Sequence, residues 1–203
     1  MKTYDLAVIG SGIGGSLIAA LNRDKSHILF EKDSNVGGCA STFKRFGNSY
    51  NAGATTFVGY EENHPIKDIF DKAGFVPNIK KSEIAIRIIQ NKKVVDRVKD
   101  FDSFLDDMDK VYYHKNNRIF WSKIREIDEK FWNLKKIHYA KYSLKSYIKT
   151  TNSMMELFSI FGFDIIKSAD SFIDEILPNI SKAYKNFIDS QLLITIQTKS
   201  KGI

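Results

Sequence analysis

A glycine-rich segment that directly follows a short apolar run constrains this chain more than any other feature. Residues 4–9 are typical of a buried parallel strand. Residues 10–15 then match the pattern G-x-G-x-x-G, residues 16–21 indicate a helix, and residues 27–30 form a second apolar run that ends at Glu31. This order of strand, glycine turn, helix, strand and acidic residue predicts a βαβ unit that binds a dinucleotide.

Each position of the glycine segment has a physical reason. Gly10 allows a tight turn out of the strand, Gly12 lets the backbone approach a pyrophosphate, and Gly15 lets the helix pack closely on the strand. The pyrophosphate is expected at the helix N-terminus, where free N–H groups and the positive end of the helix dipole face it. Glu31 is placed to accept a hydrogen bond from a ribose 2′-hydroxyl, and its charge disfavours the 2′-phosphate of NADP. An ordinary turn without a ligand is the alternative.

Two further segments resemble the amine oxidase and phytoene desaturase group of flavoproteins. Residues 32–42, KDSNVGGCAST, are similar to the group's stretch from the ribose-binding Glu to a Gly-Gly pair. Residues 47–59, GNSYNAGATTFVG, are similar to the segment G-[FY]-x-F-D-x-G-[AP]-T of phytoene desaturases and carotenoid isomerases. The resemblance implies FAD, with both segments beside its pyrophosphate, ribityl chain and flavin edge. A nicotinamide dehydrogenase has no reason for a second glycine pair here.

The predicted cofactor site joins residues of the glycine pattern to residues that the resemblance implies. The complete set is Gly10, Ser11, Gly12, Gly14, Gly15, Glu31, Lys32, Gly37, Gly38, Gly53, Ala54 and Thr55. Three positions depart from the family: Asn48 replaces an aromatic residue, Asn51 replaces Asp, and Cys39 replaces a cation after the glycine pair. Because the chain has no second Cys, we expect a packed or inert thiol at Cys39. No catalytic residue is assigned, and no metal site is expected.

The remainder of the chain indicates a change of architecture. Residues 65–74 predict a short helix closed by glycine, and residues 83–98 predict a β-hairpin that turns at residues 91–93. Residues from 101 onward are mostly helical. We therefore predict an α/β chain in which an incomplete, FAD-binding Rossmann-like βαβ unit (residues 1–75) joins an α+β portion of a substrate-binding domain (residues 76–203).

Two apolar patterns in the helical region predict core packing. One is a helix face with spacings of four, three, four and three residues, formed by Phe120, Ile124, Ile127, Phe131 and Leu134. The other is a dense cluster at Met154, Met155, Leu157, Phe158, Ile160, Phe161 and Phe163. The lining of a channel for an apolar substrate is the alternative for the second cluster. His64 and His114 are expected to be surface residues.

The number of candidate strands predicts that this chain does not complete the fold. Only two strands suit the parallel sheet, whereas a doubly wound sheet normally has about five or six. The resemblance covers the amino-terminal part of a longer family chain, and the family's carboxy-terminal glycine-aspartate motif is absent. We expect a truncated form or a split-gene product, in which a second polypeptide completes the fold.

The resemblance implies an FAD-dependent oxidoreductase that acts on an apolar substrate of isoprenoid or carotenoid type. A flavin amine oxidase, an inactive fragment and a nucleotide-binding subunit of a split flavoenzyme are the alternatives. The chain has no secretory signal, no apolar run of about 18 residues and a single Cys, so we expect a cytoplasmic protein.

Basic residues are concentrated in one part of the chain. Residues 110–149 contain eleven Lys or Arg and three acidic residues, whereas the whole chain has a net charge of +7. A solvated helix face is the simplest interpretation. Contact with an anionic membrane surface is the alternative, and it would suit delivery of a lipid-soluble substrate. No motif supports nucleic-acid binding.

Overall fold

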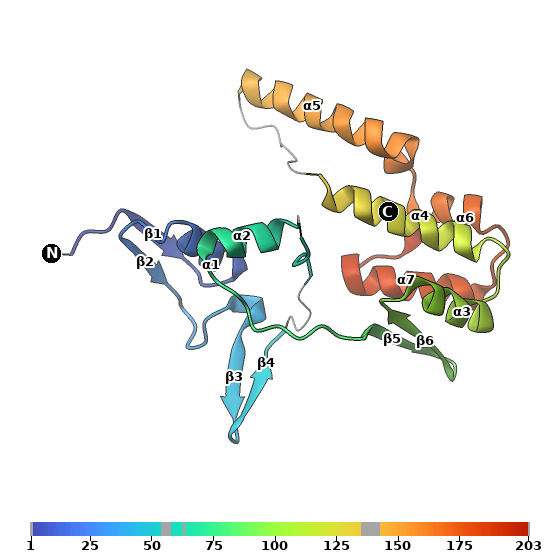
Figure 1. Cartoon of the computed structure of the whole chain (residues 1–203), viewed down its shortest axis with the longest axis horizontal. Coiled ribbons are helices and arrows are strands. Elements are labelled where there is room, and N and C mark those ends of the chain that lie inside the picture. The colour runs from blue at the N-terminus through green and yellow to red at the C-terminus, as the bar shows by residue number, and fades with distance from the viewer. Residues whose placement is uncertain (1, 54–57, 63, 135–142, 203) are drawn as a thin grey trace. The chain divides into compact units, whose positions relative to one another are not determined.

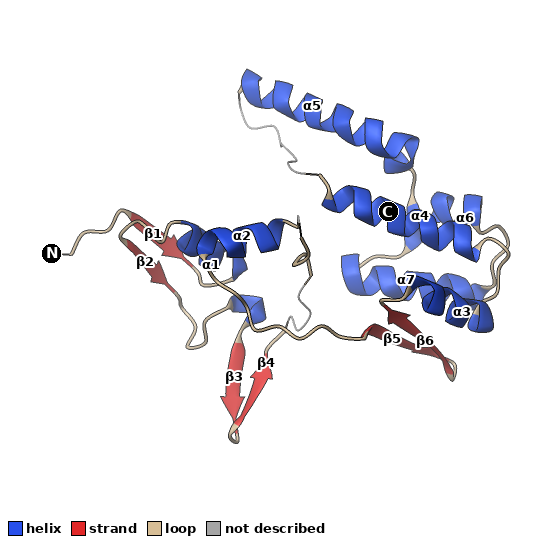
Figure 2. Cartoon of the chain, in the orientation of Figure 1, coloured by secondary structure: helices blue, strands red, loops and turns tan. Residues whose placement is uncertain are grey.

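The computed structural model describes residues 2–53, 58–62, 64–134 and 143–202. The chain divides into an amino-terminal unit, residues 1–79, and a carboxy-terminal unit, residues 80–203. The predicted α/β class is confirmed, since parallel and antiparallel strands occur together with helices (Figures 1 and 2). The roles that the sequence assigns to the two parts stay predictions.

The amino-terminal unit begins with the predicted βαβ arrangement. Strands β1 (Leu6–Ile9) and β2 (His27–Phe30) are parallel, and helix α1 (Ile13–Leu21) connects them (Figure 1). The helix begins three residues earlier than the sequence suggests, because Gly12 is already extended and the next residues adopt helical geometry. Gly14 and Gly15 therefore lie inside the first turn of α1.

A short helical turn, an antiparallel strand pair and a second helix follow. They are η1 (Gly38–Ala40), β3 (Thr42–Arg45), β4 (Asn48–Asn51) and α2 (Pro65–Ala73). Helix α2 ends as predicted, because Gly74 takes the left-handed conformation that suits a helix terminus. The Arg23 guanidinium, just beyond α1, donates a hydrogen bond to the Ala73 carbonyl and so ties α2 to α1.

The carboxy-terminal unit begins with the predicted hairpin. Strands β5 (Ile84–Gln90) and β6 (Lys93–Val98) are antiparallel. Asn91 and Lys92 form a two-residue loop, and both have positive φ angles, of 50° and 65°. This geometry belongs to the hairpin turns whose twist matches that of the strands. Lys93, which the sequence places in the turn, is the first residue of β6.

Helices make up most of the remaining described residues of this unit (Figure 2). They are α3 (Phe101–Val111), α4 (Asn117–Trp132), α5 (Leu144–Phe161), α6 (Ala169–Ile176) and α7 (Lys182–Ile196), with short turns η2 (Gly162–Ile166) and η3 (Ser200–Gly202). Asp100, Ser143, Ser168 and Ser181 begin four of the helices, and their side chains accept a backbone N–H of the first turn. None of the helices in the described residues has the length and apolar character needed to cross a membrane.

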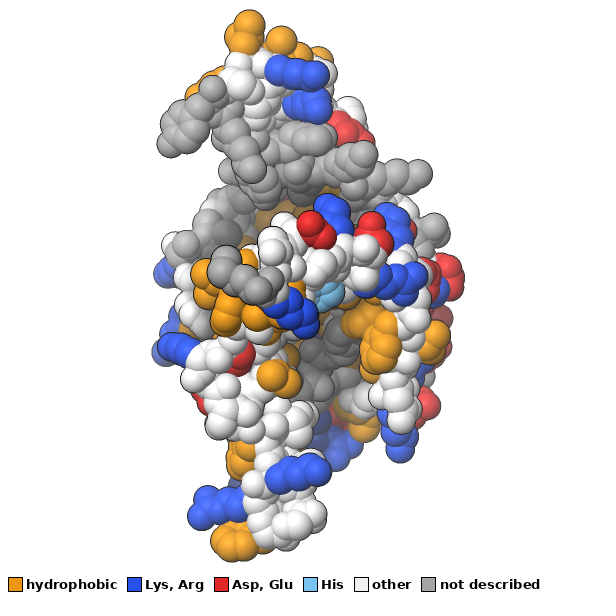
Figure 3. All heavy atoms as spheres, turned by 90° about the vertical axis from the view of Figure 1, so that its left-hand side faces the viewer, with side chains coloured by type: hydrophobic (Ala, Val, Ile, Leu, Met, Phe, Trp, Pro, Cys, Tyr) orange, Lys and Arg blue, Asp and Glu red, His pale blue; other side chains and the backbone are white. Residues whose placement is uncertain are grey.

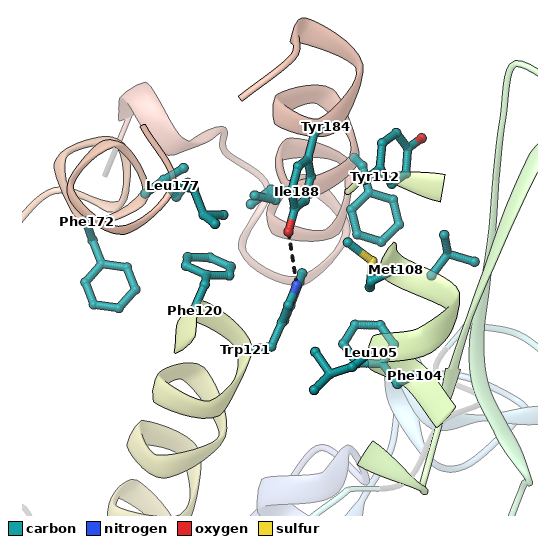
Figure 4. Packing of buried hydrophobic residues seen from close by; sticks show 13 residues of the cluster. Phe104, Leu105, Met108, Tyr112, Phe120, Trp121, Phe172, Leu177, Tyr184 and Ile188 are labelled. Atoms are coloured by element: carbon teal, nitrogen blue, oxygen red, sulfur yellow. Dashed lines mark hydrogen bonds between the residues drawn. The ribbon is translucent and has the colours of Figure 1, made fainter. Parts of the chain in front are cut away.

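A hydrophobic core forms where α3, α4, α6 and α7 meet strand β6 (Figure 4). Its buried members are Val95, Phe104, Leu105, Met108, Tyr112, Phe120, Trp121, Phe172, Ile173, Leu177, Tyr184, Phe187 and Ile188. A polar network crosses this core. The Trp121 indole donates to the Tyr184 hydroxyl over 3.1 Å, and that hydroxyl donates to Asn117 Oδ1 over 2.8 Å. Asn117 Nδ2 donates in turn to Asp109 and to the Tyr112 carbonyl. The buried polar groups are thereby satisfied.

The predicted apolar face of α4 is correct only in its first part. Phe120 is buried, and Ile124 and Ile127 pack against the core. Phe131 is 51% exposed, and Leu134 lies beyond the end of the helix. The core contacts α4 from its first turn to Ile127, and it includes Trp121, which lies next to the predicted apolar face.

The prediction that the Met and Phe cluster packs in a core is wrong. Met155 and Phe163 are 65% and 75% exposed, and Ser153 is the buried residue of α5. Helix α5 packs mainly on η2, and the core helices are α3, α4, α6 and α7. An apolar sequence is buried only where another element covers it, and none of the elements in the described residues covers this face of α5.

Substitution of Asn117 tests the polar network. We expect Asn117→Ala to lower the free energy of unfolding by about 3 kcal/mol, because the Tyr184 hydroxyl and the Tyr112 carbonyl lose a buried partner. Urea unfolding of the full chain, followed by tryptophan fluorescence, measures the change. Arg118→Ala is the matched control on the next residue, where an exposed ion pair with Asp102 is worth about 1 kcal/mol or less. Equal losses in both variants would contradict the assigned role.

Candidate functional site

The first glycine turn connects β1 to the N-terminus of α1. Gly10 has a φ of 90°, and its N–H donates to the Phe30 carbonyl over 2.7 Å, so the ends of β1 and β2 are joined. Gly12 is extended and directly precedes the helix. A residue without a side chain leaves the first N–H groups of α1 accessible, which is the arrangement that binds an anion such as a pyrophosphate.

Gly15 lies where α1 contacts the end of β1. A Cβ on Gly15 would be 1.9 Å from the Gly10 carbonyl oxygen and 3.3 Å from Val8 Cγ1. No side chain fits at that distance, so a glycine is needed for this helix–strand contact. Gly14 differs, because a Cβ there would meet no atom within 4 Å.

The second glycine pair lies against the first turn. Gly37 and Gly38 have φ angles of 112° and 57°. A Cβ on Gly38 would come within 3.1 Å of Gly12 Cα, and one on Gly53 would be 2.6 Å from the Cys39 carbonyl oxygen. Residues from three separate segments therefore meet by backbone contact. Ala54 and Thr55, which the resemblance also implies, lie outside the described residues.

A hydrogen-bond network joins these segments through Ser11, which is 4% exposed. Glu31 Oε2 accepts hydrogen bonds from Ser11 N over 2.7 Å and from Ser11 Oγ over 2.5 Å. Glu31 Oε1 accepts one from Asp33 N over 3.0 Å. The Gly37 N–H donates to Ser11 Oγ over 2.9 Å. One hydroxyl thus contacts both the acidic residue at the end of β2 and the second glycine turn.

These donors change the acidity of Glu31. The Ser11 hydroxyl, followed by the backbone N–H groups of Asp33 and Ser11, lowers the pKa of the Glu31 carboxyl to about 2. Hydrogen bonds to the charged form of a carboxyl group have this effect. Glu31 is therefore a carboxylate at neutral pH, and it is an acceptor for the hydroxyl groups of a ribose.

Other candidate residues contribute less to the site. Lys32 and Cys39 are exposed. Of the two alternatives expected for Cys39, a packed or an inert thiol, the packed thiol is therefore wrong, and the inert thiol stays a prediction. The reason is that Cys39 belongs to the short turn η1 and not to a core element. His114 is half-buried, and its ring contacts the Pro178 carbonyl over 3.2 Å, which indicates a structural role. His64 is half-buried as well. Within the described ranges, His, Cys, Asp and Glu side chains form no group of three or more suited to a metal ion.

Comparison with known proteins identifies the amino-terminal segment. Residues 8–73 match the family described as an NAD(P)-binding Rossmann-like domain. The matched range runs from the end of β1 to α2 and includes both glycine turns and Glu31. A dinucleotide cofactor of flavin or nicotinamide type is thereby supported at the first glycine turn.

Two curated relatives confirm the resemblance to the phytoene desaturase group. All-trans-retinol 13,14-reductase of Danio rerio is 38% identical over 74 residues, which are 35% of this chain and 12% of that protein. The 4,4′-diapophytoene desaturase (4,4′-diaponeurosporene-forming) of Staphylococcus aureus (strain COL) is 35% identical over 71 residues, which are 34% of this chain and 14% of that protein. Each alignment therefore spans a small part of a much longer relative.

A solved structure shows a similar fold over a greater length. The crystal structure of the PF1083 protein from Pyrococcus furiosus aligns with 98% of this chain and 39% of its own, with a TM-score of 0.53 and 14% identity. At this identity the likeness concerns the fold alone. Both units therefore have counterparts in the fold of one larger protein.

Paired alanine substitutions test the close contact of α1 with β1. We expect Gly15→Ala to lower the melting temperature, at a cost of about 1–3 kcal/mol, because the new methyl group overlaps the Gly10 carbonyl. Gly14→Ala, one residue earlier in the same helix, has free space and should raise stability by up to about 1 kcal/mol. Thermal unfolding monitored by circular dichroism measures both. A Gly15→Ala variant as stable as the wild type would show that the contact does not require glycine.

Proposed function

We propose that this chain binds FAD at the two glycine turns and belongs to an FAD-dependent oxidoreductase that acts on an isoprenoid or carotenoid-like substrate. The proposal rests on one observation: the first glycine turn, the second glycine turn and the segment at Gly53 lie against one another near the N-terminus of α1. The first turn and Glu31 suit any dinucleotide, whereas the second turn at Gly37–Gly38, with Gly53 behind it, resembles the flavoprotein arrangement. The names of the two curated relatives, a retinol reductase and a diapophytoene desaturase, support the substrate class.

The residues of the chain have defined tasks in this proposal. The free N–H groups of α1 and the backbone at Gly12 bind the pyrophosphate, and Glu31 accepts a ribose hydroxyl. The Gly37–Gly38 turn allows the cofactor to approach the backbone closely, since no Cβ intervenes. When bound, FAD supplies a hydride acceptor for oxidation of the substrate. A flavin amine oxidase shares the same glycine turns, but neither curated relative is named as one.

The exposed faces of the parallel strands favour a partner for the amino-terminal unit. Parallel strands are normally covered on both faces and hydrogen-bonded on both edges. Here Ile9 is 89% exposed and Phe30 is 54% exposed, and β1 and β2 form a sheet of two strands. We propose that a second polypeptide adds strands to this sheet and completes the cofactor site.

Ligand binding by a variant of Gly12 tests the proposed cofactor site. We expect the full chain to bind FAD and ADP, and not FMN, because the described residues suit the ADP portion of the cofactor. Gly12→Ala should lower the affinity for both ligands at least tenfold while leaving the unfolding curve unchanged, since its Cβ meets no protein atom within 4 Å. Isothermal titration calorimetry measures the affinities, with NAD⁺ as a further ligand. Preference for NAD⁺ over FAD would contradict the FAD assignment, and absence of all dinucleotide binding would contradict the site itself.

Helix α5 provides a surface that suits an anionic membrane, and we propose that the apolar substrate arrives there. Leu144, Ile148, Met155 and Phe158 recur at helical spacing and are all exposed. Residues 130–155 contain six Lys and no acidic residue. Figure 3 shows apolar side chains beside lysine side chains at the end of the view where α5 lies. An apolar helix face flanked by lysines binds at the interface of anionic lipids.

Vesicle sedimentation tests this surface. We expect the chain to sediment with vesicles that contain phosphatidylglycerol and much less with pure phosphatidylcholine. Ile148→Glu should reduce the bound fraction several-fold, because it places a charge in the apolar face of α5. Ile119→Glu is the matched control, since Ile119 on α4 is 59% exposed and Ile148 is 55% exposed. Equal partitioning of the chain to both kinds of vesicle, or equal loss in both variants, would remove the proposal.

A further inference from the structure

The Ser11 hydroxyl lies between two segments that are far from it in the sequence. Glu31 is 20 residues away and Gly37 is 26 residues away, and both contact Ser11 Oγ, over 2.5 Å and 2.9 Å. The hydroxyl donates its hydrogen to the carboxylate and accepts the Gly37 N–H, so both functions of the group are used. Ser11 is 4% exposed, so water competes little for these two hydrogen bonds.

The backbone holds Ser11 in place independently of its hydroxyl. Ser11 N also donates to Glu31 Oε2, over 2.7 Å, and the Ser16 hydroxyl donates to the Ser11 carbonyl over 2.8 Å. The first glycine turn would therefore keep its path if the hydroxyl were removed. The link from Glu31 to the Gly37 N–H, by contrast, runs through the hydroxyl, since no backbone group of Ser11 contacts Gly37 in the described hydrogen bonds.

The arrangement also determines how the carboxylate meets a ligand. Glu31 Oε2 already accepts two hydrogen bonds from Ser11, which matches the two lone pairs of a carboxylate oxygen. Glu31 Oε1 accepts a hydrogen bond from Asp33 N and is the oxygen left for a ribose hydroxyl. Hydrogen bonds from the protein thus distinguish the two oxygens and orient the carboxylate, and preorganisation of this kind favours affinity.

We propose that Ser11 is a positioning residue of the dinucleotide site, whose hydroxyl joins the Glu31 carboxylate to the Gly37–Gly38 turn and directs Glu31 Oε1 to the ribose. This inference depends on the proposed function only for the identity of the ligand. The link between the three segments consists of hydrogen bonds between groups of the protein itself. Ser11 thus connects the carboxylate that binds the ribose to the Gly37–Gly38 turn, which the cofactor approaches closely.

Titration of Glu31 in the ligand-free chain tests the link. Carbon-13 NMR of the labelled Glu31 carboxyl follows its pKa in the wild type, Ser11→Ala, Ser11→Thr and Ser34→Ala. We expect Ser11→Ala to raise the pKa from about 2 toward the ordinary value of 4.5, because the hydroxyl is the largest cause of the lowering. Ser11→Thr retains a hydroxyl and should keep the pKa low. Ser34→Ala is the matched control, since its exposed hydroxyl contacts only Asp33 among the described hydrogen bonds.

The pH dependence of stability gives a second readout. The folded pKa of Glu31 lies below the unfolded value, so its contribution to stability is present above about pH 4.5 and is lost as the pH falls toward 2. Ser11→Ala should therefore lose less stability than the wild type between these two pH values. Amide exchange at Gly37 should accelerate in Ser11→Ala, because the N–H loses its acceptor. A side chain that only fills space would move neither readout.

Calorimetry with ADP at neutral pH provides the ligand arm. We expect Ser11→Ala to bind ADP about tenfold more weakly than the wild type, Ser11→Thr to retain most of the affinity, and Ser34→Ala to match the wild type. An unchanged pKa of Glu31 in Ser11→Ala overturns the inference, and so does equal affinity of Ser11→Ala and the wild type for ADP. Failure of the wild type to bind ADP overturns the proposed function instead, while the titration and the Gly37 exchange still decide whether Ser11 holds the three segments together.

Discussion

The close contact between α1 and the end of β1 is the constraint on which the amino-terminal unit depends. Because Gly15 has no side chain, the helix starts almost against the Gly10 carbonyl, at a distance where a Cβ would overlap that oxygen. This contact directs the N-terminus of α1 to the turn, and it leaves the first N–H groups near the point where the Gly37–Gly38 turn meets Gly12. A bulkier residue at position 15 would displace the helix and separate the groups that form the site.

The two units differ in how they are stabilised. The amino-terminal unit depends on backbone contacts between glycines and on the polar network at Ser11, and Val8 is its buried hydrophobic residue among those described. The carboxy-terminal unit has a continuous core in which aromatic rings from α3, α4 and α7 pack together around Asn117. A unit that buries so little apolar surface gains little from the hydrophobic effect. This difference agrees with the proposal that other strands cover the amino-terminal sheet.

Local sequence signals predicted the structure where one residue type determines the backbone. Gly74 ends α2, and Asn91 begins the hairpin turn, because both positions require a left-handed conformation that Gly and Asn adopt more readily than other residues. The same local signals did not predict which apolar residues are buried. Phe131 and Met155 have the apolar character of core residues, yet they are exposed, because periodicity reveals an apolar face and not the element that covers it.

The sequence by itself determined that the chain begins with a dinucleotide-binding βαβ unit, since glycines, strand, helix and Glu31 follow one another within about thirty residues and each acts through local geometry. Tertiary structure alone decided how Glu31 is held. No spacing rule indicates that the Ser11 hydroxyl contacts both Glu31 and Gly37, because such contacts depend on how the chain folds back after β2. Tertiary structure likewise decided that Trp121 lies in the core and that the apolar face of α5 is exposed, since burial depends on which neighbours a helix meets.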